Sequence, residues 1–173
     1  MDTPIVTYAG FWKRFVAVFI DGIVISIVQT LLFFPLYLFF GISLFPFMNA
    51  DKLENEFSTI RAVQYANDDV SLGFFVAIMS GIAFLVVVTI VLQWLYFALM
   101  ESSSKQATLG KMALGIKVTD LDGNRISFGR ATGRYFGKII SGMIFYIGFM
   151  MAGWTQKKQA LHDMLAGCLV VNN

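Results

Sequence analysis

The fold is decided by the stretch Trp12-Lys-Arg-Phe-Val-Ala-Val-Phe-Ile-Asp21-Gly22, which opens an apolar run that continues to Phe40. Between Phe15 and Phe40 the only charged side chain is that of Asp21. About 20 apolar residues, at about 1.5 Å of rise each, cross a bilayer core of about 30 Å. We therefore expect a first membrane-spanning helix over residues 12–40, with a carboxylate inside it.

That carboxylate needs partners. Asp21 lies seven residues after Arg14, so it returns to nearly the same helix face about 10 Å further along. This separation is too long for a direct contact, and a third group from elsewhere in the chain should lie beside them. Either both residues are structural, or Asp21 binds or relays a cation or proton, as charged groups in membrane helices often do. A binding or assembly role is the third alternative.

Composition indicates an integral membrane protein. Of the 173 residues, 57% are hydrophobic and only 14% are charged, whereas soluble domains carry about 25% charged residues. The net charge of +2 is too small to indicate a nucleic-acid partner. A single cysteine, Cys168, excludes an intramolecular disulfide and a cysteine-cluster metal site.

The distribution of charge predicts the topology. A second apolar run over residues 73–100 predicts a second span. Residues 49–72 between the runs form an acidic loop, with a short amphipathic helix expected over 53–63. The loop 101–134 carries six basic residues, and such loops are cytoplasmic. We expect the N-terminus to share that side of the cell (inner) membrane, with the acidic loop outside.

A third hydrophobic segment, residues 135–154, contains Lys138 and four glycines. A simple third span would place Lys157 and Lys158 outside, against the charge rule. We therefore expect a broken or re-entrant hairpin that bends near Gly142 and returns the tail, 155–173, to the cytoplasm. The predicted fold is an all-α integral membrane protein of one domain, 1–173, with two long transmembrane helices and this hairpin.

Small β elements are expected in the cytoplasmic part. Apolar residues alternate over 114–118, the turn pair Asp122-Gly123 follows, and apolar residues return over 126–128. This pattern predicts a β-hairpin. The tail segment 168–171 reads as a strand that pairs with residues 116–119. Ser127 is placed to cap the helix that follows.

Three segments together resemble the RDD family of small membrane proteins, which is named for one arginine and two aspartates. They are Gly10-Phe-Trp-Lys-Arg-Phe with Ile20-Asp21, then Gln106-Ala-Thr-Leu-Gly-Lys-Met-Ala-Leu-Gly-Ile-Lys-Val118, and Gln159-Ala-Leu-His-Asp-Met-Leu-Ala-Gly167. The resemblance implies that the name residues are Arg14, Asp21 and Asp163. It also implies transport of ions or small solutes, with cation/proton exchange in some members. A related eukaryotic domain implies assembly roles as well.

The candidate site follows from this topology. With the tail inside, Asp163 arrives at the same boundary as Arg14, and we expect the two to pair. Asp21 is then left to Lys138, to water, or to the amides of Gln29 and Gln93. Glu101 is expected at the aqueous end of the second span. His162, beside Asp163, either titrates near neutral pH or serves as a hydrogen-bonded structural group.

We expect a small transporter of ions or small solutes, with a monovalent cation or proton bound at Asp21, and Arg14 and Asp163 as gate charges. So few helices predict a homo-oligomer in the lipid bilayer. The alternative is a non-transporting scaffold or accessory subunit of a larger complex. The sequence contains no recognisable catalytic set, so we expect no enzyme activity and no cofactor. Gly110-Lys111 lacks the rest of a phosphate loop, and metal binding is left open.

Overall fold

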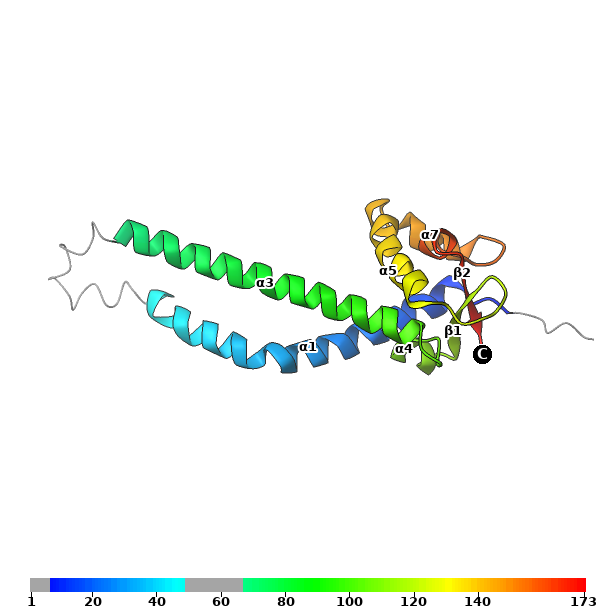
Figure 1. Ribbon diagram of the computed structural model, residues 1–173, viewed down its shortest axis with the longest axis horizontal. Coiled ribbons are helices and arrows are strands. Elements are labelled where there is room, and N and C mark those ends of the chain that lie inside the picture. The colour runs from blue at the N-terminus through cyan, green and yellow to red at the C-terminus, as the bar shows by residue number, and fades with distance from the viewer. Residues whose placement is uncertain (1–6, 49–66) are drawn as a thin grey trace, which may run out of the picture. The chain divides into compact units, whose positions relative to one another are not determined.

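The computed structural model describes residues 7–48 and 67–173. The chain forms two compact units: Met1–Ser26 together with Val91–Asn173 is the first, and Ile27–Ile90 is the second. The elements in chain order (Figure 1) are α1 (Phe11–Met48), α3 (Asn67–Glu101), α4 (Leu109–Ala113), β1 (Ile116–Asp120), α5 (Phe128–Met143), α6 (Ile147–Met150), the 3-10 helix η3 (Met151–Gly153), α7 (Leu161–Leu165) and β2 (Cys168–Asn172).

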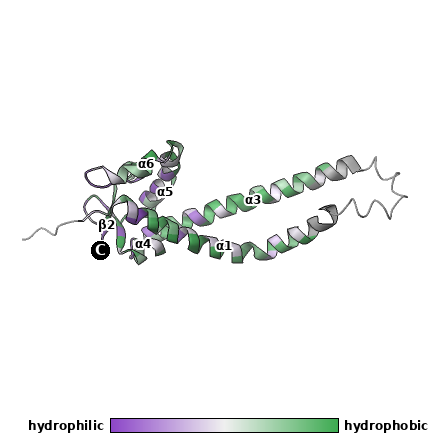
Figure 2. Cartoon of the chain, turned by 180° about the vertical axis from the view of Figure 1, so that it is seen from behind, coloured by the Kyte–Doolittle hydropathy of each residue, from purple (hydrophilic) through white to green (hydrophobic). Residues whose placement is uncertain are grey.

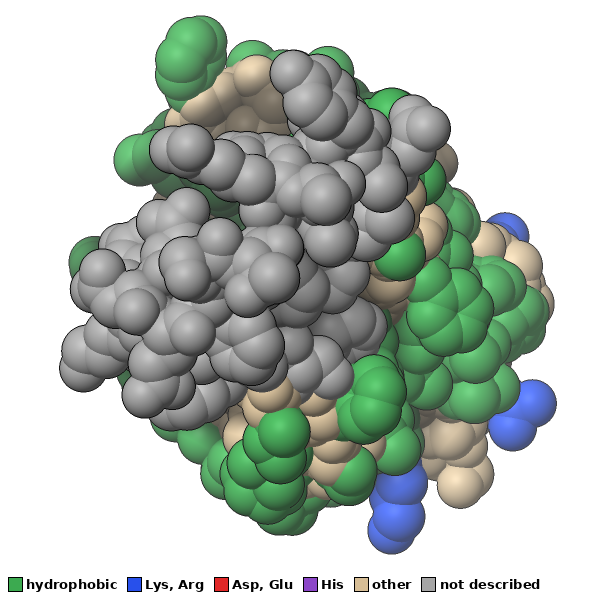
Figure 3. All heavy atoms as spheres, turned by 90° about the vertical axis from the view of Figure 1, so that its left-hand side faces the viewer, with side chains coloured by type: hydrophobic (Ala, Val, Ile, Leu, Met, Phe, Trp, Pro, Cys, Tyr) green, Lys and Arg blue, Asp and Glu red, His purple; other side chains and the backbone are tan. Residues whose placement is uncertain are grey.

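Two helices are long and apolar enough to cross a membrane. Their spanning parts are Phe11–Phe39 of α1 and Phe75–Glu101 of α3, and hydrophobic residues cover both (Figure 2). None of the most apolar stretch of α3 is buried, and only 11% of that of α1. Hydrophobic side chains also dominate the described face in Figure 3, with Lys and Arg at its edge. The two predicted spans are confirmed.

The acidic loop predicted over 49–72 is shorter at its end, because α3 already begins at Asn67. Residues 49–66, including the amphipathic helix expected over 53–63, lie outside the described residues.

A small antiparallel sheet joins distant parts of the first unit. β1 pairs with β2, with Ile116 opposite Asn172 and Asp120 opposite Cys168. The N-terminal segment adds to the other side of β2, since the backbone N–H of Ala9 donates to the carbonyl of Val170 at 2.9 Å. The predicted pairing of the tail strand is confirmed, and the N-terminal segment joins it.

The predicted hairpin strand over 126–128 is wrong. The turn forms, with Gly123 at φ +85°, but Ile126 packs into the core and Phe128 begins α5. The partner of β1 comes from the tail instead. Ser127 caps α5 as predicted, since its hydroxyl accepts from the N–H of Arg130 at 3.3 Å.

The core of the first unit draws on α1, α3, the sheet and α5. Its buried members are Ala9, Ala17, Ala98, Ile116, Val118, Ile126, Ala131, Cys168 and Val170. The faces of helix α5 are the reverse of those of a helix in a soluble protein, with small and charged residues buried and apolar residues exposed. It buries Ala131, Arg134, Gly137 and Ser141, while Phe136, Ile139, Ile140 and Met143 are exposed. An apolar outer face of this kind is expected where the solvent is lipid.

The third hydrophobic segment is bent, as predicted. Helix α5 and the α6–η3 pair meet at 117°. The break falls at Phe145 and Tyr146, both in the left-handed region at φ 46° and 61°, a few residues after the predicted Gly142. Because β1 and β2 flank the segment and pair with each other, it begins and ends beside the same sheet. This is the arrangement of a bent hairpin.

The hairpin closes through a glycine contact that a substitution can test. A Cβ at Gly148 would lie 2.8 Å from the Cα of Ser141. We expect Gly148→Ala to lower the free energy of unfolding by about 1–3 kcal/mol, because the backbones must move apart. Gly142→Ala is the control, since its Cβ would meet nothing closer than Phe149 at 4.0 Å. Thermal unfolding in detergent measures both, and equal melting temperatures would contradict this packing.

Candidate functional site

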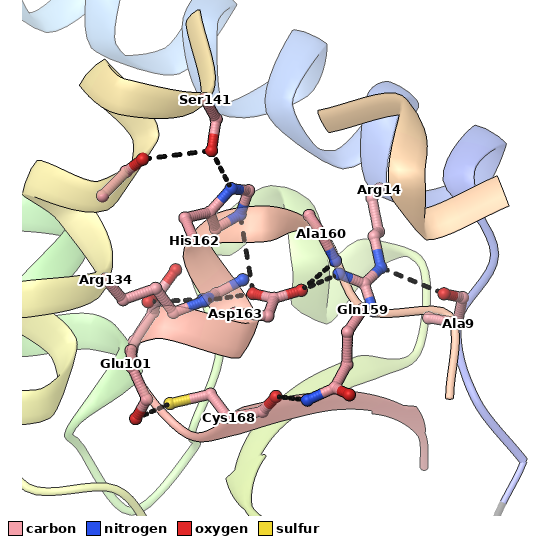
Figure 4. Close-up of polar contacts among 12 residues, drawn as sticks. Ala9, Arg14, Glu101, Arg134, Ser141, Gln159, Ala160, His162, Asp163 and Cys168 are labelled. Atoms are coloured by element: carbon pink, nitrogen blue, oxygen red, sulfur yellow. Dashed lines mark hydrogen bonds and ion pairs between the residues drawn. The ribbon is translucent and has the colours of Figure 1, made fainter. Parts of the chain in front are cut away.

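Five charged side chains of alternating sign form a buried chain of ion pairs in the first unit, which we call the ion chain. Each comes from a different helix. In order along the chain of pairs they are Arg14 (α1), Asp163 (α7), Arg134 (α5), Glu101 (α3) and Lys111 (α4). Arg14 has the most exposed side chain, at 11%. Figure 4 shows the first four members converging.

Asp163 is the centre of the ion chain and is fully buried. One oxygen, Oδ2, accepts from a terminal nitrogen of Arg14 and from the backbone N–H of Ala160, the latter at 3.1 Å. The other, Oδ1, accepts from Nε of Arg134 at 2.7 Å. Burial alone would raise the pKa of Asp163, but Arg134 and Arg14 hold it well below its usual range. The expected Arg14–Asp163 pair is present.

The ion chain continues through Glu101, which ends the second span as expected but is buried in the protein, at 1% exposed. Its Oε2 accepts from Arg134 at 2.6 Å, and its Oε1 accepts from the ammonium of Lys111. Lys111 is 4% exposed. Burial and the charge of Arg134 lower the pKa of Lys111 to about 7, although Glu101 opposes this change.

Lys138 adds a further cation on α5. Its ammonium lies 4.0 Å from the centre of the Phe97 ring, a cation–π contact. It makes no hydrogen bond or ion pair with Asp21, so Lys138, one of the alternatives expected beside Asp21, is not in direct contact with it, although the charge of Asp21 still acts on Lys138. Together with the ion chain it gives four cations against the two carboxylates of Asp163 and Glu101.

Asp21 is fully buried and is held by neutral donors. Its Oδ1 accepts from the hydroxyl of Tyr96 at 2.9 Å and from the N–H of Gly110 at 2.7 Å. Its Oδ2 accepts from the hydroxyl of Thr108 at 2.5 Å. The N–H of Leu109 donates in turn to the Tyr96 oxygen at 3.1 Å. Asp21 therefore fastens the first residues of α4, the helix that carries Lys111, to α1.

This attachment requires a glycine. A Cβ at Gly110 would lie 2.1 Å from the carbonyl oxygen of Ala17 and 3.0 Å from Cγ of Asp21. Only a residue without a side chain lets α4 approach α1 this closely.

Neither amide expected beside Asp21 is there. Gln29 belongs to the second unit, and its buried Nε2 has no hydrogen-bond partner among the described residues. Gln93 is half-buried and joins neither Asp21 nor the ion chain.

His162 is buried and structural. Its Nδ1 lies 3.2 Å from the hydroxyl of Ser141, and its ring centre lies 5.1 Å from that of Phe149. Burial lowers the pKa of His162 to about 3, although Asp163 opposes this change. The lowered pKa and the contact with Ser141 favour the hydrogen-bonded interpretation over titration near neutral pH.

The sequence analysis did not assign Arg134, Lys111, Tyr96 or Thr108 to the site. For Arg134 a signal existed, because Ala131, Gly137 and Ser141 lie on its face of α5 at helical spacing. Small residues around a cation mark a face that packs against protein. Within residues 7–48 and 67–173, no three His, Cys, Asp or Glu side chains are grouped to hold a metal ion.

Comparison with known proteins gives two matches. The RDD family model matches residues 8–167. A protein of Bacillus subtilis (strain 168), named "Uncharacterized protein YxaI", is 36% identical over 166 residues, which cover 94% of this chain and 96% of that protein. No solved structure matches the chain. The matched residues include Asp21 and every member of the ion chain.

Removing the carboxylate of Asp163 should strongly destabilise the protein. Asp163→Asn leaves the buried Arg134 and the half-buried Arg14 without their shared anion, a change that costs about 3–5 kcal/mol in buried pairs. The melting temperature in detergent should fall sharply, whereas Asp122→Asn, at an exposed turn position, should leave it unchanged. A wild-type melting temperature for Asp163→Asn would show that the ion chain does not hold the helices together.

Acid should destabilise the protein through His162, which is the only histidine. Its pKa is about 6.5 when unfolded and about 3 when folded, so its contribution is complete above about pH 6.5 and is lost toward pH 3. In this window stability should fall by up to about 1.4 kcal/mol per pH unit. Melting curves between pH 7 and 4.5 should be flatter for His162→Gln. Equal slopes would contradict a neutral buried histidine.

Proposed function

Because the chain belongs to the RDD family and carries two helices able to cross a membrane, we propose that it is a membrane transport protein. The proposed reaction exchanges a proton for a monovalent cation. The observation that carries this proposal is Lys111, an ammonium buried in the ion chain. A pKa of about 7 lets this group gain and lose a proton at neutral pH.

The exchange follows from the pairing of Lys111 with Glu101. When Lys111 releases its proton, one oxygen of Glu101 loses its ionic partner while Arg134 keeps the other. A monovalent cation then replaces the lost positive charge beside the carboxylate. One proton leaves as one cation binds, and the net charge of the site is unchanged. Attraction between these groups is strong because the site is screened from water.

The remaining residues position this pair. Asp21 holds α4, which carries Lys111, against α1. Asp163 ties Arg14 to Arg134, the second partner of Glu101. We assign Asp21, Arg14 and Asp163 positioning and gating roles, and we place the exchanging pair at Lys111 and Glu101 instead of at Asp21.

Orientation and assembly follow from charge and size. The six basic residues of the 101–134 loop favour a cytoplasmic position for the first unit in the cell (inner) membrane. The N-terminal segment and β2 are hydrogen-bonded, which supports placing both termini on that side. Two spans and a hairpin have few surfaces to enclose a path, and the apolar faces of α1 and α3 are exposed. We propose a homo-oligomer in the bilayer.

A second candidate is a non-transporting scaffold or accessory subunit of a larger complex. The observation that favours it is the complete pairing of two buried carboxylates. Asp21 and Asp163 each accept three hydrogen bonds. A network this fully paired also suits a purely structural role, in which it holds α4, α5 and α7 against α1 and α3 within the first unit.

Flux in liposomes tests the proposal. Purified protein should exchange external Na⁺ or K⁺ for internal protons, reported by a pH-sensitive dye, with an inflection near pH 7. Lys111→Arg keeps the charge, but a guanidinium does not release its proton in this range. We expect this variant to lower flux by more than about ten-fold, since proton transfer by a positioned group contributes at least that much.

Two variants accompany this measurement. Lys105→Arg makes the same change at an exposed lysine and should leave flux intact. Asp21→Asn should lower flux and melting temperature together, because α4 loses its anchor. Unimpaired exchange by Lys111→Arg would remove Lys111 from the mechanism. Absence of flux from folded wild-type protein at every pH would favour the scaffold.

A further inference from the structure

An apolar groove lies where α1 begins, outside the ion chain. Its volume is about 410 Å³, and it is lined by Gly10, Phe11, Trp12, Met150, Gly153, Trp154 and Lys158. The two tryptophans are 74% and 63% exposed. All of these residues belong to the first unit. The groove therefore combines an apolar floor, two amphipathic rings and one cation.

Lys158 is held in place at this groove. Its backbone is in the left-handed region, at φ 46°, and its carbonyl accepts from Arg14 at 2.6 Å. Its N–H donates to the carbonyl of Thr155 at 2.9 Å. A non-glycine residue keeps such a backbone only when its surroundings enforce it. The backbone of Lys158 is thus fixed before any ligand binds.

The ammonium of Lys158 is available. Its Nζ lies 3.9 Å from where a Cβ of Gly10 would stand, so it reaches over the groove. It makes no ion pair or hydrogen bond with any described residue, in contrast to Lys111. Lys157 beside it is also exposed. An unpaired cation beside an apolar groove is complementary to an anion that carries apolar groups.

We propose that this groove binds an anionic phospholipid, with its phosphate at Lys158 and the start of an acyl chain between Trp12, Met150 and Trp154. The site lies at the end of the spanning part of α1, which begins at Phe11, the depth at which headgroups occur. Tryptophan rings favour this depth because they are apolar with one polar edge. Basic residues next to a membrane helix attract anionic headgroups.

Quenching of tryptophan fluorescence by brominated lipid tests the site. The full chain is reconstituted in phosphatidylcholine vesicles that contain about 10 mol% brominated phosphatidylglycerol or brominated phosphatidylcholine. Wild-type protein should prefer the brominated anionic lipid. Lys158→Gln should lower that preference by about five-fold, the factor that one cation near an anionic headgroup supplies. Lys158→Arg should restore it, and Lys105→Gln should leave it unchanged.

Several other outcomes of this experiment would overturn the proposal. Equal quenching by the two brominated lipids in wild-type protein overturns the proposal. So does a preference that survives Lys158→Gln in a variant with wild-type melting temperature, or one that Lys105→Gln also removes. Added inorganic phosphate should not compete. If millimolar phosphate abolishes the preference, the groove holds a free anion and the lipid assignment is wrong.

Discussion

Asp163 held between two arginines is the interaction on which the rest of the first unit depends. Its carboxylate joins α7 to α1 through Arg14 and to α5 through Arg134. Arg134 also pairs with Glu101 of α3, and Glu101 pairs with Lys111 of α4. Buried ion pairs of this kind add little net stability, because desolvation offsets attraction. What they add is specificity, since each charge accepts few other arrangements without being left unpaired.

Helix α5 shows how the membrane setting reverses an ordinary packing rule. Its small and charged residues face the protein, while Phe136, Ile139 and Ile140 face outward. In a soluble protein, such a helix would bury its apolar face and expose Arg134 to water. In lipid the outward apolar face carries no desolvation cost, and Arg134 faces the protein interior, where it pairs with Glu101 and Asp163. The same logic explains why Asp21 collects three donors from α3 and the start of α4.

The parts that sequence predicts well are those controlled by local composition. Apolar length predicts both spans, glycine content and Lys138 predict the bent segment, and Ser127 predicts a helix start. The pairing of Arg14 with Asp163 follows from topology. The partners of Asp21 do not, because Thr108 is 87 residues away and a hydroxyl carries no signal of its own. The hairpin prediction failed at Ile126 because alternation cannot distinguish a strand from a single residue packed in the core.

The pairing of two residues far apart in the sequence has a consequence for biogenesis. Arg14 and Asp163 are separated by 149 residues, so the ribosome delivers Arg14 well before Asp163. Throughout that interval the guanidinium of Arg14 lacks its final partner, whereas the partners of Asp21, which are Tyr96, Thr108 and Gly110, are made earlier. The ion chain is therefore complete only after α7 has been synthesised. A product terminated before Asp163 would carry both apolar helices but would leave Arg14 and Arg134 without their shared carboxylate.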